Sequence, residues 1–129
     1  EKNIKKAGML KYVTLHNQNL KKSRKLPVTE ADLVVIDLGD PWEVLPQVRK
    51  MLKSSGSVVA ICPTMNQLEK LSTAFVENEF TDIECTEHIL RHIEARDGKT
   101  RHSFRGLGHS TYLAIARKVY FNKKRSNKK

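Results

Sequence analysis

The chain has 129 residues and a formal net charge of +10, from 24 lysines and arginines against 14 aspartates and glutamates. The charge is uneven, because residues 1–25 carry +7, residues 117–129 carry +7 and residues 26–116 carry −4. This distribution excludes a uniformly basic coat of the histone type. It leaves open a polyanionic partner such as RNA, met by the two ends and by selected loops.

Length and hydrophobic content predict a single globular domain. A chain of this size can bury an ordinary core, and 39% of its residues are hydrophobic. The longest apolar runs, Leu33–Ile36 and Val58–Cys62, are much shorter than the ~18 residues that a membrane span needs. Cys62 and Cys85 lack Cys-x-x-Cys spacing, so we expect reduced thiols in a cytoplasmic protein, with the nucleus as the alternative in a eukaryote.

The N-terminal region predicts the end of a helix, a short strand and a polar loop. Residues 1–7 have the pattern of the last turns of a helix closed by Gly8, with lysines suited to a helix C-terminus. Because the start of this helix is missing, we expect the chain to be part of a longer polypeptide. Residues 12–15 predict a short strand, and residues 17–31, with the basic run Lys21–Lys25, predict a loop.

Two apolar runs, each followed by a helix start signal, predict β/α units. Leu33–Ile36 is apolar on both faces, as in the centre of a covered sheet, and Asp40–Glu43 supplies a cap residue, a proline and a glutamate at capping-box spacing. Ser54–Gly56 predicts the end of that first helix. Val58–Cys62 is the second buried strand, and Thr64–Gln67 is a second capping box that opens the next helix.

The C-terminal third predicts two more strands around a basic loop. Residues 81–93 alternate, which predicts a long strand whose protected face carries Ile83, Cys85, Ile89 and Ile93. Residues 95–109 predict a basic loop, Thr111–Val119 a last strand, and residues from Asn122 a disordered tail. The whole order predicts an α/β fold with a mostly parallel sheet and a C-terminal antiparallel hairpin at its edge.

Polar side chains follow both buried strands, at the places where ligands bind in open α/β sheets. These are segments 37–42 and 63–67. Ligands of such sheets sit at the carboxyl ends of the strands. If the two strands pair, the segments are neighbours, and we expect their side chains to converge on one cleft.

Four segments resemble, in order and spacing, those of the tRNA adenine-N1 methyltransferases that act on the T-loop adenine. Ile36–Glu43 is similar to the motif after the fourth strand of that family, and Val59–Gln67 to the segment after the fifth. Gly108–Lys118 resembles the final strand, and Asn3–Gly8 the helix before the third strand. Together they cover roughly residues 1–119.

The resemblance implies a Rossmann-like S-adenosylmethionine-dependent methyltransferase fold and the methylation of adenine N1 at position 58 of tRNA. Residues 1–121 would be the C-terminal part of the catalytic domain and residues 122–129 a basic tail. The glycine-rich cofactor motif would precede Glu1, so we expect the fragment to be inactive alone. The implied cofactor is S-adenosylmethionine, and the implied partners are tRNA and the family subunits of a homo- or hetero-tetramer.

The resemblance also assigns roles to residues. Asp37 would be the catalytic carboxylate, and Asn19, Asp37 and Leu38 would contact the cofactor; Asn19 stands where the family often has an aspartate. The implied substrate and RNA contacts are Asp40, Trp42, Pro63, Thr64, Gln67, Arg101, Arg105 and His109. The chemistry of the residues agrees for Asp37, because N1 methylation moves positive charge onto adenine. A fixed carboxylate that accepts a hydrogen bond from the N6 amino group stabilises that charge.

Several residues keep a structural interpretation beside the functional one. Asp40 is explained as a helix cap, Thr64 and Gln67 as a capping pair, and Trp42 as a packing residue. His88 and His92 have a spacing that metal ligands use on a helix, but their surroundings alternate like a strand and no third ligand is evident, so we expect no metal.

Two alternatives to the enzyme remain open from the sequence. One is a non-catalytic tRNA-binding subunit of such a methyltransferase complex, in which the basic loop and the ends would hold RNA. The other is a methyltransferase that acts on a different substrate.

Overall fold

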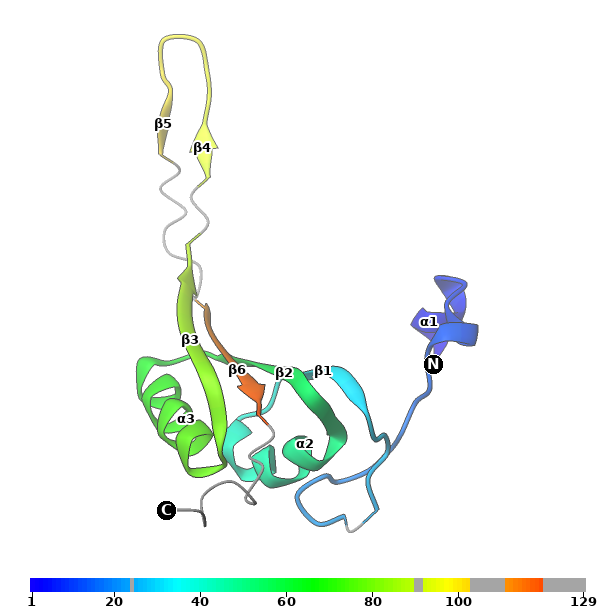
Figure 1. Cartoon of the computed structure of the whole chain (residues 1–129). Coiled ribbons are helices and arrows are strands. Elements are labelled where there is room, and N and C mark those ends of the chain that lie inside the picture. Colours follow the sequence, from blue (N-terminus) through cyan, green and yellow to red (C-terminus); the bar gives the residue numbers. More distant parts are fainter. Residues whose placement is uncertain (24, 90–91, 103–110, 120–129) are drawn as a thin grey trace.

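The computed structural model describes residues 1–23, 25–89, 92–102 and 111–119 (Figure 1). None of the helices in these residues is long and apolar enough to cross a membrane. The elements in chain order are α1 (Lys2–Lys6), the 3₁₀ helix η1 (Leu10–Tyr12), β1 (Ala31–Ile36), the 3₁₀ helix η2 (Pro41–Val44), α2 (Leu45–Met51), β2 (Leu52–Cys62), α3 (Met65–Glu77), β3 (Phe80–His88), β4 (Ile93–Glu94), β5 (Arg101–His102) and β6 (Thr111–Lys118).

Four strands form one sheet in the order β1-β2-β6-β3. β1 and β2 are parallel, with Ile36 opposite Ala60, while β6 is antiparallel to both β2 and β3. Three strands therefore run in one direction, and the last strand runs against them between β2 and β3. This confirms the predicted α/β fold, the mostly parallel sheet and the antiparallel pairing of the last two long strands at its edge, with β3 outermost.

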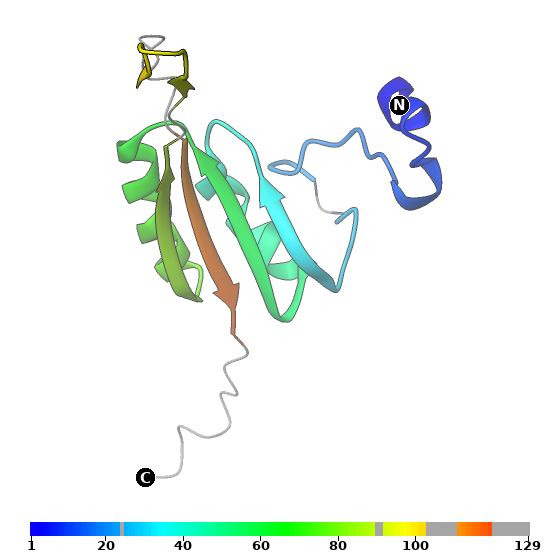
Figure 2. The ribbon, with the colours of Figure 1, turned by 90° about the horizontal axis from the view of Figure 1, so that it is seen from above.

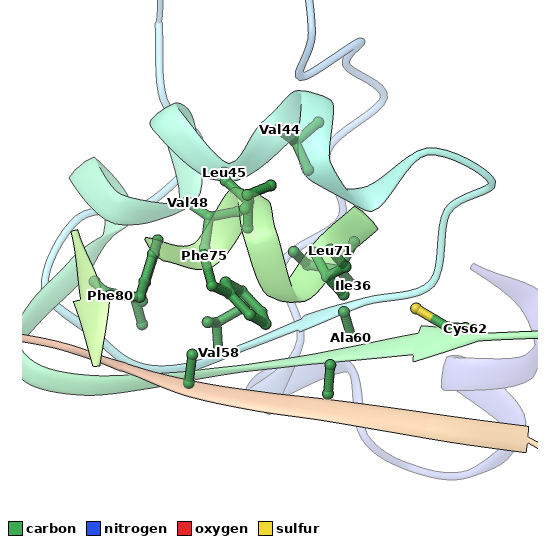
Figure 3. Close-up of a cluster of buried hydrophobic side chains, with 14 residues drawn as sticks. Ile36, Val44, Leu45, Val48, Val58, Ala60, Cys62, Leu71, Phe75 and Phe80 are labelled. Atoms are coloured by element: carbon green, nitrogen blue, oxygen red, sulfur yellow. The ribbon is translucent and has the colours of Figure 1, made fainter. Parts of the chain in front are cut away.

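The core lies between one face of the sheet and the helices. α2 and α3 both cover this face (Figure 2). β2 alternates, so that Val58, Ala60 and Cys62 point into the core while the residues between them are half-buried on the other face. Phe75 of α3 meets Phe80 of β3 edge to face, with ring centroids 5.5 Å apart (Figure 3). Such a core fixes the sheet, and hence the ends of its strands, against the helices.

The predicted strand at residues 12–15 is wrong. The chain forms η1 there and then continues without regular structure, and Tyr12 and Leu15 are 71% and 57% exposed. A strand needs a neighbour for its backbone N–H and C=O groups, and no described strand pairs with these residues.

The helix predicted to start at Asp40 begins in the right place but in a different form. It starts as the 3₁₀ helix η2 and becomes α-helical only at Leu45, and the Asp40 side chain makes no capping hydrogen bond. Pro46 is the physical reason. A proline suits the first turn of an α-helix but not its interior, because it lacks the N–H that an interior position must donate. The helix end predicted at Ser54–Gly56 lies at Met51, three residues earlier.

The predicted long strand at residues 81–93 is two strands. β3 ends at His88, and β4 pairs with β5 in a separate two-stranded sheet, Ile93 opposite His102 and Glu94 opposite Arg101. The protected face is wrong beyond Ile83, since Cys85 is exposed and Ile89 and Ile93 are 60% and 61% exposed. The chain leaves the core here, so alternation no longer corresponds to burial. The basic loop predicted at residues 95–109 contains β5, while residues 103–109 and the tail from Asn122 lie outside the described residues.

Candidate functional site

The two polar segments that follow β1 and β2 come together at one edge of the sheet. The parallel register brings the end of β1 beside the end of β2, with Ile36 opposite Ala60. Gln67, in the first turn of α3, then donates a hydrogen bond from Nε2 to the backbone oxygen of Gly39, 2.9 Å away. This confirms that segments 37–42 and 63–67 are neighbours, as the sequence predicts.

The second segment is held by the capping box that the sequence predicts. Thr64 has an extended backbone, and its hydroxyl oxygen accepts a hydrogen bond from the Gln67 N–H at 3.3 Å. The same hydroxyl donates to Oε1 of Gln67 at 3.0 Å. The side-chain amide of Gln67 therefore has a partner at each end, Thr64 on its own helix and Gly39 on the neighbouring segment.

Asp37 follows the last buried residue of β1 and is exposed. Leu38 is 44% exposed. Within the described part of the chain, no side chain forms an ion pair or hydrogen bond with the Asp37 carboxylate. The side chain thus lies at the end of β1, on a backbone fixed by Ile36 in the core. A carboxylate in this place can accept hydrogen bonds from an amino group of a ligand.

The loop before β1 is attached to the same edge by Lys21. Its ammonium nitrogen lies 2.6 Å from Glu43 Oε2 and 3.7 Å from Asp40 Oδ2. The hydrogen bond with Glu43 raises the pKa of Lys21 above its ordinary value of 10.5. Two residues earlier, Asn19 accepts the Lys21 N–H on its side-chain oxygen at 3.0 Å. The ion pairs of Lys21 with Glu43 and Asp40 thus bring the loop that carries Asn19 to the Asp40 end of the site.

Trp42 lies between the core and a surface hollow. It is half-buried and packs against the hydrophobic core, and the Lys70 ammonium group lies 4.1 Å from its ring centroid. The hollow, about 440 Å³, is lined by Trp42, Asn66, Glu69, Lys70, Thr73, Ala74, Glu77 and Asn78. Trp42 therefore packs against the core, and one face of its ring is occupied by a cation.

β4, β5 and the basic residues between them form an arm and do not line the site. β4 and β5 extend away from the four-stranded sheet (Figure 1), from the edge at which β1 (cyan) and β2 (green) end (Figure 2). Arg101 in β5 pairs with Glu94 at 3.4 Å. Arg105 and His109 lie outside the described residues. No group of three or more potential metal ligands is found among the described residues.

The site contains three contributors that the sequence does not reveal: the Gly39 carbonyl, Lys21 and Lys70. Each meets a partner on another element, 28 residues away in the case of Gly39 and Gln67. The only local signal is the basic run that contains Lys21, and it does not indicate which acidic residue Lys21 contacts.

Known structures with this arrangement define the class of protein. The tRNA (m1A58) methyltransferase TrmI of Aquifex aeolicus is 30% identical, with a TM-score of 0.78 over 93% of this chain and 48% of that one. An S-adenosylmethionine-dependent O-methyltransferase of Thermotoga maritima is 25% identical, with a TM-score of 0.83 over 95% and 45%. The chain has the Rossmann-like fold of the S-adenosylmethionine-dependent methyltransferases.

The family follows from the sequence. The model of the family described as the tRNA methyltransferase complex GCD14 subunit matches residues 1–128, so the chain belongs to this family. A curated relative, the tRNA (adenine(57)-N(1)/adenine(58)-N(1))-methyltransferase TrmI of Methanocaldococcus jannaschii, is 36% identical over 72% of this chain and 33% of its own length. The chain spans 46% of the TrmI of Thermus thermophilus, which is 27% identical. It therefore spans less than half of either curated relative.

Proposed function

We propose that this chain is part of an S-adenosylmethionine-dependent methyltransferase that methylates N1 of the T-loop adenine at position 58 of tRNA. Family membership and the activities in the names of the TrmI relatives support this function. The observation that carries it is the Asp37 carboxylate, exposed at the point where the ends of β1 and β2 meet. Residues 1–121 would be the C-terminal part of the catalytic domain.

Asp37 is the proposed catalytic residue. As the adenine N1 lone pair attacks, positive charge develops on the base, and a carboxylate that accepts a hydrogen bond from the N6 amino group stabilises it. The target base must leave its stack to reach the site. The rest of segments 37–42 and 63–67, with Asp40, Trp42, Pro63 and Thr64, would then position it.

The residues beside Asp37 fit the adenosyl part of the cofactor. Leu38 exposes an apolar side chain. The side-chain amide of Asn19 uses its oxygen to accept the Lys21 N–H, and its NH₂ group is a hydrogen-bond donor. When bound, S-adenosylmethionine supplies an electrophilic methyl group on a sulfonium. Asn19, Asp37 and Leu38 would hold it by hydrogen bonding and apolar contact.

The arm of β4 and β5 is the proposed RNA contact. It extends from the side of the sheet on which β1 and β2 end (Figure 2), and it contributes Arg96, Lys99 and Arg101. With Arg105 and His109, these side chains would bind phosphates, which give salt-dependent affinity without selecting a base. Assembly into a tetramer with family subunits and a cytoplasmic location belong to the same proposal.

The test is titration of S-adenosylmethionine into the full-length protein, followed by the isosteric change Asp37→Asn. We expect cofactor binding and methyl transfer in the unmodified protein. Transfer should fall at least about 100-fold in Asp37→Asn, because removing a group that stabilises transition-state charge costs about 10²–10³ in rate. tRNA affinity, measured by filter binding, should stay within about twofold, since phosphate contacts supply most of it.

Two outcomes would contradict the proposal. Unchanged turnover in Asp37→Asn would remove the role assigned to that carboxylate. Failure of the full-length protein to bind S-adenosylmethionine while it still binds tRNA would favour the non-catalytic, tRNA-binding subunit.

A further inference from the structure

Segment 37–40 carries the proposed catalytic carboxylate, yet packing does little to hold it. Leu38 is 44% exposed, and a Cβ atom added to Gly39 would meet nothing within 4 Å. The Asp40 carboxylate is 3.7 Å from Lys21, which itself sits on an exposed loop. Among the described residues, the hydrogen bond from Gln67 Nε2 to the Gly39 oxygen joins this segment to a helix of the core.

Gln67 comes from a rigid element. α3 is 13 residues long, and its Leu71 and Phe75 are fully buried in the core. The Gly39 oxygen can only accept, so the Nε2 end of the Gln67 amide faces it, and the Oε1 end accepts the proton of the Thr64 hydroxyl. The orientation of the amide is thus determined by Gly39 and Thr64 together.

We propose that Gln67 is a positioning residue, which links the Gly39 carbonyl to the start of α3 and so fixes the place of the Asp37 carboxylate. This role rests on the function proposed above and differs from a direct substrate contact. One donor and one acceptor of its amide are engaged within the chain, which holds the amide between Gly39 and Thr64. Catalytic groups act within narrow tolerances, and a displacement of about 1 Å costs up to about 10²-fold in rate.

The substitution that isolates this role is Gln67→Glu. A carboxylate still accepts the Thr64 hydroxyl proton, and the backbone N–H of position 67 still reaches Thr64, so the helix cap is kept. The donor to Gly39 is lost, and an oxygen is turned toward the Gly39 oxygen. The matched control is Glu69→Gln, the reverse exchange at an exposed position on the next part of the same helix.

The first measurement is amide hydrogen exchange on this chain, which requires no activity. Gln67→Glu should speed exchange in residues 37–40 several-fold while residues 68–77 keep their protection. The fluorescence of Trp42, the only tryptophan, should shift because Trp42 lies two residues after Asp40, the last residue of that segment. Glu69→Gln should leave exchange in residues 37–40 unaltered. Unchanged exchange there in Gln67→Glu would overturn the proposal.

The second measurement is methyl transfer by the full-length protein. For Gln67→Glu we expect kcat to fall roughly tenfold to a hundredfold with KM for tRNA nearly constant, because the altered group acts on the reacting geometry and not on binding. A raised KM with unchanged kcat would instead make Gln67 a substrate contact and overturn the positioning role. Absence of transfer by the unmodified protein would overturn the proposed function, while hydrogen exchange would still decide whether Gln67 holds segment 37–40.

Discussion

Near the carboxyl ends of β1 and β2, single side chains link segments that are far apart in the sequence. Gln67 connects α3 to the segment after β1, and Lys21 connects the long loop before β1 to Glu43. The pKa of Lys21 is raised in the folded chain, so the contact with Glu43 contributes its full stability below pH 10.5 and loses it as the pH rises through the higher value. Lys21 therefore keeps its positive charge throughout the physiological pH range.

The two cysteines allow a prediction at the same scale. Cys62 is fully buried and Cys85 is exposed. Desolvation raises the pKa of both thiols above 9.0, and Cys85 adds to the shift at Cys62. In a titration with a thiol-reactive disulfide reagent at pH 7.5, one thiol should react in the native protein and the second only on unfolding. The native thiol should react faster as the pH increases, because the thiolate is the reactive form.

The control for this titration is Cys85→Ser, which should abolish the native reaction and leave the reaction on unfolding. Two thiols that react at equal rates in the native protein would contradict the burial of Cys62 in the core.

At the scale of elements, a helix or strand is predictable from the sequence where the contacts that form it are local. The start of α3 is predictable because Thr64 and Gln67 satisfy each other within one turn. The short strand at residues 12–15 is not, because a strand forms only where a partner is present and the sequence does not show whether one is. The convergence of the two strand ends follows from parallel pairing alone, whereas the contacts of Lys21 and Lys70 depend on side-chain placement across elements.

β2 contains an irregularity near Ser54–Gly56, where the sequence predicts the end of a helix. Ala31 lies opposite Leu52, but Leu33 lies opposite Ser57, so β2 has extra residues between two paired positions. Ser55 has a φ of 64°, in the left-handed region. The segment at which the sequence predicts the end of a helix is thus a bulge inside β2, and the strand begins directly after α2.

Gly56 should be needed at this bulge. A Cβ atom at Gly56 would lie 2.9 Å from the Ala31 oxygen and 3.0 Å from the Lys53 oxygen, both of which are backbone atoms with little freedom to move. We expect Gly56→Ala to lower the free energy of unfolding by about 1–3 kcal/mol, as overpacking does. The measurement is urea unfolding followed by Trp42 fluorescence.

Gly39→Ala is the matched control for this change. An added Cβ there meets nothing within 4 Å, so the unfolding free energy should stay within about 0.5 kcal/mol of the original. Equal losses for the two variants would show that the cost comes from the general loss of glycine and not from the crowding at the bulge.

At the scale of the whole chain, the four-stranded sheet has two different faces. α2 and α3 cover one of them, while among the described residues no helix packs on the other (Figure 2). On the uncovered face β1 presents Leu33 and Val35, which are 52% and 61% exposed. β1 is also the edge of the sheet and pairs only with β2 among the described strands. An edge strand with exposed apolar side chains favours association between chains.

We therefore expect the double variant Leu33→Thr, Val35→Thr to reduce self-association of this 129-residue chain. Threonine keeps the β-branched shape that suits a strand, and both side chains are half-exposed, so the loss in unfolding free energy should be no more than about 1 kcal/mol for each. Val76→Thr, which alters a 65% exposed valine on α3, is the control for apolar surface elsewhere. Sedimentation over a range of concentrations should show weaker association for the double variant alone, since only the β1 changes act on an open edge. If the control weakens association equally, exposed apolar area in general and not the β1 edge drives it.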